Sequence, residues 1–336
     1  MPRVGRHPLK EKLIKENQVM PQNVTMTTIV YIPTLDGYWK ESFDVLKLFF
    51  RSLQENTNEP YDLMVFDNGS CSEIRDYMIN LRDQGIIQYL ILSEKNLRKL
   101  GALNYLLQSA PGEFISYADS DVYFLPGWLD ESLKVLNTFP EAAKLTALPI
   151  VGGDTTQISE SSYKSALKDS SITVETVKLV SNEFVEAHNI SIGKSLKKFE
   201  ETNPNRKDTK LTRNGISAFL SGADFQFTIK KDALKEVLPL LIENEEDYYD
   251  PIYSPILEKK LYNHNWWQLS TSDYFIHHLG NKKPNLGLEL PWREINDSSL
   301  EIEDIPFRNR RYILNKYIRK ILKIINLWSY KKLYGK

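Results

Sequence analysis

The chain has few of the features that cross-link a protein or place it in a membrane. It contains a single cysteine, Cys71, in 336 residues, which excludes an internal disulfide and gives no support for a zinc site. No continuous apolar stretch approaches the roughly 18 residues of a membrane span, and the charged segment 1–18 lacks the apolar centre of a signal peptide. We therefore expect a cytoplasmic protein.

Two common patterns for binding phosphate groups are also absent. No Gly-x-Gly-x-x-Gly follows the first predicted strand, and no Gly-x-x-x-x-Gly-Lys-Ser/Thr occurs anywhere in the chain. If the protein binds a diphosphate, a metal ion must therefore do work that a glycine-rich loop does elsewhere.

Strand and helix patterns alternate along the first half of the chain. The predicted strands are 27–32, 62–66, 86–92 and a fourth that begins at Phe114, and the predicted helices are 43–54, 72–84 and 100–109. This alternation predicts an α/β fold with a mostly parallel central sheet and helices on both faces. With 41% hydrophobic and 26% charged residues, the chain has the composition of an ordinary globular protein.

The fourth strand leads into two carboxylates, Asp119 and Asp121, with Ser120 between them. Because parallel strands end at one edge of their sheet, Asp67 after the second strand should lie along the same edge. Paired carboxylates suit Mg²⁺ or Mn²⁺, and such an ion would hold a diphosphate. The alternative is a polar turn that caps the next helix.

Several motifs stand in the order found in family 2 glycosyltransferases with the GT-A fold, and the chain resembles that family over about residues 27–135. The motifs are Ile32-Pro33-Thr34, Val65-Phe66-Asp67-Asn68-Gly69-Ser70, the segment 96–104 and Asp119-Ser120-Asp121. The resemblance implies an enzyme that transfers a sugar from a nucleotide-diphospho-sugar, most often a UDP-sugar. The acceptor would be a hydroxyl of a glycan or a lipid-linked molecule.

The resemblance also implies roles for single residues. Asp67 would accept a hydrogen bond from the base, Asp119 would lie near the ribose and the metal, and Asp121 would be the direct metal ligand. The other residues expected around the nucleotide sugar are Pro33, Thr34, Asn68, Lys99, Gly101, Asn104, Ser120, Gly222 and Asp224. For Lys99 the alternative is a solvated basic residue beside Arg98, and for Asn104 it is a structural tie between loops.

The second half holds the predicted catalytic and metal-completing residues. Direct displacement needs a carboxylate that accepts the proton of the acceptor hydroxyl. The resemblance implies that this base lies in the acidic run 243–250, and the spacing found in the family favours Asp250 over Asp247. The alternative is that the run is a solvated surface. A single base and the family resemblance together imply inversion at the anomeric carbon. The resemblance also implies that a histidine after the last core strand completes the metal shell. Only one of His277 and His278 can do so, since neighbours on a strand point to opposite faces.

We divide the chain into an extension (1–24), a GT-A domain (25–290) and a tail (291–336). The domain comprises a nucleotide-binding half (25–150), a flexible insertion (151–214) expected over the active-site mouth, and an acceptor and metal-completing half (215–290) that opens with a strand-like stretch, 216–229.

The tail has a composition of its own. Residues 306–336 contain ten Lys or Arg and no Asp or Glu, with apolar residues at helical spacing. This pattern predicts a basic amphipathic helix that lies on an anionic membrane surface or docks on protein. Because the rest of the chain is acidic and shows no aromatic-basic module, nucleic acid is not an expected partner.

Two other functions stay open on the sequence alone. A sugar nucleotidyltransferase also uses acidic metal sites, but the expected glycine-rich basic loop after the first strand is missing from 34–38. A catalytically silent nucleotide-sugar or glycan-binding module is the alternative outside enzymes, and the presence of both Asp119 and Asp121 argues against it.

Overall fold

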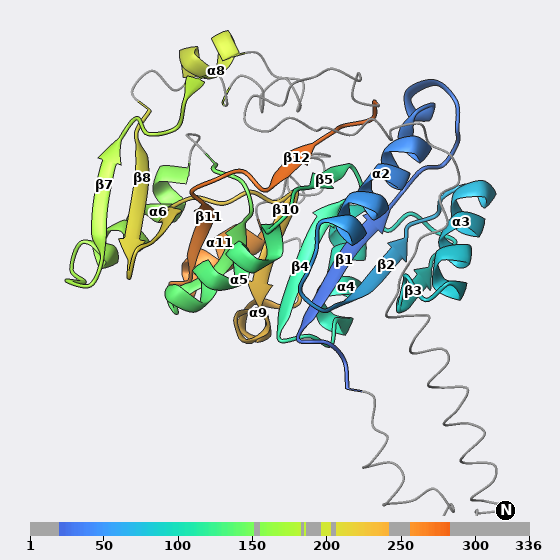
Figure 1. Cartoon of the computed structure of the whole chain (residues 1–336), viewed down its shortest axis with the longest axis horizontal. Coiled ribbons are helices and arrows are strands. Elements are labelled where there is room, and N and C mark those ends of the chain that lie inside the picture. The colour runs from blue at the N-terminus through green and yellow to red at the C-terminus, as the bar shows by residue number, and fades with distance from the viewer. Residues whose placement is uncertain are drawn as a thin grey trace, which may run out of the picture.

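Ten strands form one sheet in the computed structural model, which describes residues 20–150, 155–182, 185, 196–202, 206–241 and 256–282 (Figure 1). Their order across the sheet is β3-β2-β1-β4-β10-β6-β11-β9-β8-β7, and a separate two-stranded sheet pairs β12 with β5. The strands are β1 (Val24–Val30), β2 (Tyr61–Asp67), β3 (Tyr89–Leu92), β4 (Phe114–Asp119), β5 (Val122–Phe124), β6 (Ala142–Thr146), β7 (Thr173–Val177), β8 (Asp208–Arg213), β9 (Ile216–Phe219), β10 (Gln226–Lys230), β11 (Trp267–Thr271) and β12 (Ile276–His278).

The first four strands of this order are parallel, and their ends meet at one edge. Val30 of β1 pairs with Asp67 of β2, and Ile29 pairs with Asp119 of β4. Strand β10 runs antiparallel between β4 and β6, β11 is again parallel to β6, and β9, β8 and β7 continue the sheet as an antiparallel extension. The predicted α/β fold class is confirmed, and the two acidic turns lie on the same edge as expected.

Helices cover both faces of the sheet. They are η1 (Gly37–Trp39), α2 (Ser42–Glu55), α3 (Ser72–Asp83), α4 (Arg98–Ser109), α5 (Trp128–Thr138), α6 (Thr155–Ala166), α8 (Leu196–Thr202), α9 (Lys231–Val237) and α11 (Ile256–Asn263). Alternate residues of β2 face opposite sides: Leu63 and Val65 pack in the cluster that contains α2 and α3, and Met64 and Phe66 pack in the cluster that contains α4, α9 and α11.

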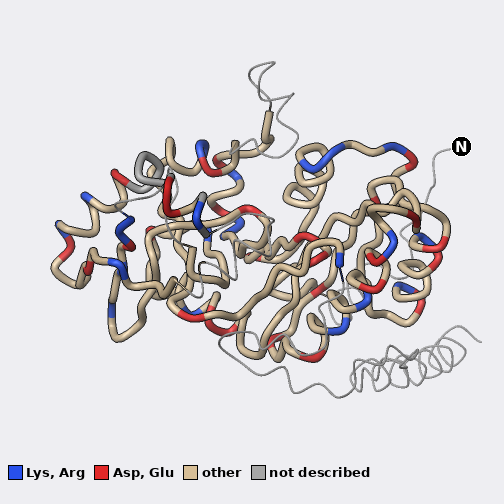
Figure 2. The backbone as a smooth tube through the Cα atoms, turned by 90° about the horizontal axis from the view of Figure 1, so that it is seen from above, with Lys and Arg blue, Asp and Glu red and all other residues tan. Residues whose placement is uncertain are grey.

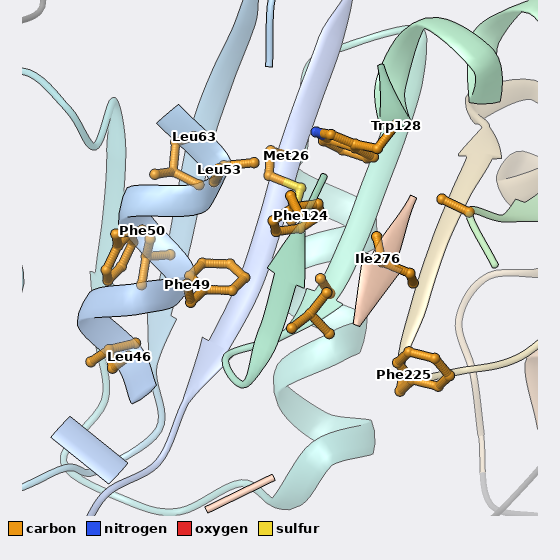
Figure 3. Packing of buried hydrophobic residues seen from close by; sticks show 14 of the residues in the cluster. Met26, Leu46, Phe49, Phe50, Leu53, Leu63, Phe124, Trp128, Phe225 and Ile276 are labelled. Carbon is orange, nitrogen blue, oxygen red and sulfur yellow. The ribbon is translucent and has the colours of Figure 1, made fainter. Parts of the chain in front are cut away.

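The core on the α2 side is rich in aromatic rings (Figure 3). Phe49 lies 5.7 Å from Phe124, and Phe124 lies 4.5 Å from Trp128, measured between ring centroids. Met26 of β1 and Ile276 of β12 pack in the same cluster. The pair β5–β12 is thereby fixed against the main sheet, close to the carboxyl end of β4.

One part of the sequence-based prediction, the strand-like stretch 216–229, needs correction. The stretch 216–229 is not one strand but two, β9 and β10, which β6 and β11 separate in the sheet. The predicted insertion 151–214 contains α6, β7, α8 and β8. Its strand β7 lies at the sheet edge and alternates exposed with half-buried residues, so its apolar signal is weak.

The tail 291–336 and most of the extension 1–24 lie outside the described residues. Among the residues that the structure does describe, no helix has the length and apolar character to cross a membrane. Basic and acidic side chains are interspersed along this part of the chain (Figure 2).

Candidate functional site

A cavity of about 600 Å³ opens at the sheet edge where β1, β2 and β4 end. Its lining is of two chemical kinds. One group of side chains is apolar or aromatic: Ile29, Tyr31, Ile32, Trp39 and Val45. The other group is polar or charged: Asn96, Arg98, Lys99, Asp119, Ser120 and Asp121. Such a lining can take a ligand that carries both an apolar ring and charged groups.

The aromatic side chains that line the cavity were not predicted from the sequence. Trp39 lies edge-on to Tyr31 at 5.7 Å and to Tyr38 at 5.0 Å, measured between ring centroids. Tyr31 leaves β1 directly, and Trp39 ends the short helix η1. Two aromatic residues soon after the first strand were the available signal, but only the turn between them brings both rings to one cavity.

Asp119 has its two carboxylate oxygens bound inside the protein. The Tyr117 hydroxyl donates to Oδ1, and the Lys99 ammonium lies 2.9 Å from Oδ2. The same ammonium lies 5.4 Å from the centroid of the Tyr117 ring. Partial burial opposes the charge of Lys99, but the carboxylates of Asp119, Asp224 and Asp121 outweigh it, so the pKa of Lys99 is raised.

Asp121 and His278 come together because β5 and β12 are paired. The Leu279 N–H donates to the Asp121 carbonyl at 2.8 Å, and His278 Nε2 lies 3.4 Å from Asp121 Oδ2. Asp121 Oδ1 and His278 Nδ1 are buried and have no hydrogen-bond partner among the described residues. Burial raises the pKa of Asp121, with His278 opposing the shift and Asp119 adding to it. Asp121 and His278 therefore contact each other through one atom each, and each has a second buried polar atom without a partner among the described residues.

The other predicted metal residues contribute differently. His277 is adjacent to His278 on β12 and points to the opposite face, and burial lowers the pKa of its ring to about 4, with His278 adding to the effect. Within the described residues, no three His, Cys, Asp or Glu side chains are grouped so that they alone could hold a metal ion. A divalent ion here would depend on ligand oxygens in addition to Asp121 and His278.

Asp224 precedes β10, and its carboxylate interacts electrostatically with Lys99 and Asp119. Burial raises its pKa, Lys99 opposes the shift, and Glu258 and Asp119 add to it. The Glu258 carboxylate contacts the ammonium of Lys144, whose side chain is fully buried. The contact between Lys144 and Glu258 was not predicted from the sequence, because 114 residues separate the two.

The side chains of Asp67 and Asn68 are both hydrogen-bonded to other groups of the protein. The Asp67 side chain is 0% exposed; its Oδ1 accepts from the Ser70 N–H at 2.9 Å, and its Oδ2 lies 3.2 Å from Arg75 Nε. A direct contact with a base would therefore require Asp67 to become exposed. Asn68 lines the cavity but is hydrogen-bonded to the segment 96–98.

Several residues expected to contact the nucleotide lie outside the cavity lining. Asn104 lies outside the cavity lining, and its amide pairs with the backbone of Leu240 through bonds of 2.7 and 2.8 Å, which fits the alternative of a structural tie between loops. The Thr34 hydroxyl is exposed and lies 3.3 Å from Asp36 Oδ2, and Pro33 lies beside it, half-buried, outside the cavity lining.

The predicted glycines approach protein atoms. A Cβ added to Gly101 would lie 3.0 Å from the Leu97 Cβ, and one added to Gly222 would lie 3.6 Å from the Gln268 Cβ. Gly101 therefore allows a close approach within the chain, whereas a Cβ at Gly222 would make only an ordinary van der Waals contact. Asp247 and Asp250 lie outside the described residues, so the catalytic base stays a prediction from sequence.

Comparison with known proteins gives a family. The model of glycosyl transferase family 2 matches residues 30–217. No curated protein sequence matches the chain. Among solved structures, TarS from S. aureus in complex with UDP is similar at 13% identity and a TM-score of 0.42, over 76% of this chain and 59% of that one.

Two further solved structures are similar at the same level. Glucosyl-3-phosphoglycerate synthase from Mycobacterium tuberculosis, solved with Mn²⁺, UDP and glucosyl-3-phosphoglycerate, has 13% identity and a TM-score of 0.41, over 78% of this chain and 73% of that one. GalNAc-T7, solved with UDP, GalNAc and Mn²⁺, has 13% identity and a TM-score of 0.45, over 80% of this chain and 46% of that one. This chain thus spans less than two thirds of the length of TarS and of GalNAc-T7.

Proposed function

The chain belongs to glycosyl transferase family 2, and on that premise we propose that it transfers a sugar from a nucleotide-diphospho-sugar, with UDP as the nucleotide, to a hydroxyl of a glycan or lipid-linked acceptor. The observation that carries the proposal is the centre formed by Asp121 and His278, where a buried carboxylate oxygen has no partner among the described residues. Asp121 lines the same cavity as Lys99 and the aromatic rings of Tyr31 and Trp39.

The polarity of the cavity supports one orientation of the nucleotide. Tyr31 and Trp39 offer ring surfaces to a base, and stacking on an aromatic ring tolerates any base. Lys99 offers a positive charge whose raised pKa keeps the ammonium protonated at neutral pH. The base therefore lies toward Trp39, and the diphosphate lies between Lys99 and Asp121.

The donor set fits a divalent ion. Asp121 and His278 provide a carboxylate oxygen and an imidazole nitrogen 3.4 Å apart, and Mg²⁺ or Mn²⁺ is commonly held by one or two protein ligands together with substrate phosphates. When bound, such an ion would neutralise the negative charge of the diphosphate. Asp119 would stay with Lys99 and hold its ammonium in place.

The chain's own residues have distinct tasks in the transfer. Lys99 binds and orients the diphosphate, and Asp224 places a carboxylate near Lys99. We propose one carboxylate of the run 243–250, Asp250 ahead of Asp247, as the base that takes the acceptor proton, and hence inversion at the anomeric carbon. The basic residues in 306–336 support attachment to an anionic membrane surface on the cytoplasmic side.

Thermal melting against nucleotides tests this proposal. We expect UDP or a UDP-sugar together with Mn²⁺ to raise the melting temperature, because a ligand that binds only the folded state stabilises it. Asp121→Asn should abolish the Mn²⁺-dependent part, and Asp130→Asn, at an exposed carboxylate of α5, should retain it. If no nucleotide at millimolar concentration shifts the wild-type melt, a role as a donor-dependent enzyme is contradicted.

A further inference from the structure

The loop that follows β2 connects two walls of the cavity. On one side it fixes the chain that leaves β1: the Ile32 N–H donates to the Ser70 hydroxyl at 3.1 Å, and the Cys71 N–H donates to the Ile32 carbonyl at 2.9 Å. On the other side it fixes the chain that enters α4, through the side chain of Asn68. The same short loop thus bonds both to the chain that carries Tyr31 and Ile32 and to the chain that carries Lys99, and all three residues line the cavity.

The Asn68 amide is committed to the segment before α4. Its Oδ1 accepts from the Leu97 N–H at 2.7 Å, and its Nδ2 donates to Asn96 Oδ1 at 3.1 Å and to the Arg98 carbonyl at 3.4 Å. Asn96 Oδ1 also accepts from the Arg98 N–H at 2.7 Å. With the side chain buried at 3% exposure and both amide hydrogens used, Asn68 has little left for a ligand.

These bonds hold an unusual backbone conformation. Arg98 has φ +57°, in the left-handed region that residues with a side chain rarely occupy unless their surroundings fix it. The next residue, Lys99, then reaches Asp119 with a bond of 2.9 Å. If Arg98 relaxed to an ordinary conformation, the first turn of α4 would rotate and Lys99 would leave Asp119.

We propose that Asn68 is a positioning residue: together with Asn96 it holds Arg98 in the left-handed conformation and so places the Lys99 ammonium beside Asp119, where it meets the diphosphate. The inference rests on the proposed function, since it assumes that a diphosphate binds beside Lys99. It also changes the expected role of Asn68 from a nucleotide contact to a residue that acts through Lys99.

The loop has a second anchor that does not involve Asn68. The Ser93 N–H donates to the Asp67 carbonyl at 2.9 Å, and the Ser93 hydroxyl donates to the Lys95 carbonyl at 2.7 Å. Loss of the Asn68 amide should therefore leave residues 93–95 in place and release only the segment 97–98. This separation makes a local effect on binding distinguishable from general unfolding.

Isothermal titration calorimetry with UDP and Mn²⁺ tests the inference. For Asn68→Ala we expect at least tenfold weaker binding, which corresponds to about 1.4 kcal/mol, with a smaller loss for Asn96→Ala. Asn80→Ala is the matched control, because Asn80 is an exposed residue of α3, outside the cavity lining, and its side chain accepts a hydrogen bond from Gln84. If Asn68→Ala does not fold, Asn96→Ala carries the same test from an exposed position.

A double-mutant cycle with Arg98→Gly separates positioning from a plain structural role. Glycine takes a positive φ without strain, so Asn68→Ala should weaken UDP binding much less in the Arg98→Gly background than in the wild type. An equal loss in both backgrounds, or unchanged affinity for Asn68→Ala and Asn96→Ala while the wild type binds UDP, would overturn the inference alone. Failure of the wild type to bind UDP with Mn²⁺ would instead overturn the proposed function, and the inference with it.

Discussion

The buried pair Lys144–Glu258 gives a sharp prediction about stability. Lys144 belongs to β6, and its side chain is 0% exposed; its ammonium contacts Glu258 of α11 and lies 5.0 Å from the centroid of the Phe227 ring. Glu258→Gln keeps the shape of the partner but removes the carboxylate that contacts the ammonium, which leaves the electrostatic interaction of Lys144 with Asp224. Removing one member of a buried ion pair costs about 3–5 kcal/mol, and the cation–π contact offsets roughly 1 kcal/mol of this.

We therefore expect Glu258→Gln to lower the free energy of unfolding by about 2–4 kcal/mol. Urea unfolding at pH 7 measures this as a lower midpoint with an unchanged slope. The double variant Lys144→Met/Glu258→Leu should recover most of the loss, because an apolar pair of similar volume needs no desolvation of charge.

An exposed ion pair serves as the control. Glu160 and Lys164 in α6 lie 2.6 Å apart with side chains 57% and 66% exposed. Because exposed ion pairs contribute little to stability, Glu160→Gln should leave the urea midpoint almost unchanged. If Glu258→Gln costs no more than this control, Lys144 is not held in a dry site and the reasoning is refuted.

Three further predictions concern the cavity and the antiparallel extension. Lys99→Met should raise the KM for the nucleotide sugar about tenfold in steady-state kinetics, since a charge-assisted contact with the diphosphate is lost; an unchanged KM would contradict the proposed orientation. Trp39→Ala should weaken UDP binding by about 1–3 kcal/mol in calorimetry, whereas Tyr89→Ala at the exposed edge strand β3 should not. Arg213 binds Glu141 and Asp169 at 2.8 and 2.7 Å, and burial of Glu141 is outweighed by Arg213, so the pKa of Glu141 is lowered. The stabilisation from ionised Glu141 is present above the ordinary glutamate pKa and is lost as the pH falls through the lowered pKa. Arg213→Met should therefore lower the free energy of unfolding by about 1–3 kcal/mol in urea at pH 7 and by less below pH ~4. A loss that does not change with pH would argue against this ion pair.

Apolar periodicity was sufficient to predict the parallel half of the sheet. Strands β1, β2 and β4 are short apolar runs bounded by turn residues, and both acidic turns follow from their parallel order. The same signal failed at 216–229, because buried apolar residues such as Leu220 and Phe225 continue through the connection between β9 and β10. Periodicity reports burial and cannot by itself separate a strand from a buried loop.

For the site as well, the sequence was sufficient to predict some residues but not their partners. The position of Asp121 at the end of β4 could be read from the chain, but its neighbour His278 depends on the pairing of β12 with β5. Likewise, nothing local in the sequence reveals that the Asn104 amide pairs with Leu240 or that Lys144 meets Glu258. These contacts join residues far apart in the chain, and they arise only from the tertiary arrangement.

The most direct test of the account is a crystal grown with UDP and Mn²⁺ and measured for anomalous scattering from manganese. The account predicts one strong peak within about 2.5 Å of an Asp121 carboxylate oxygen and of the imidazole of His278, with the diphosphate beside Lys99 and the base toward Trp39. A manganese peak elsewhere, or UDP bound with no metal at Asp121, would contradict the central claim that this pair forms the metal centre of the donor site.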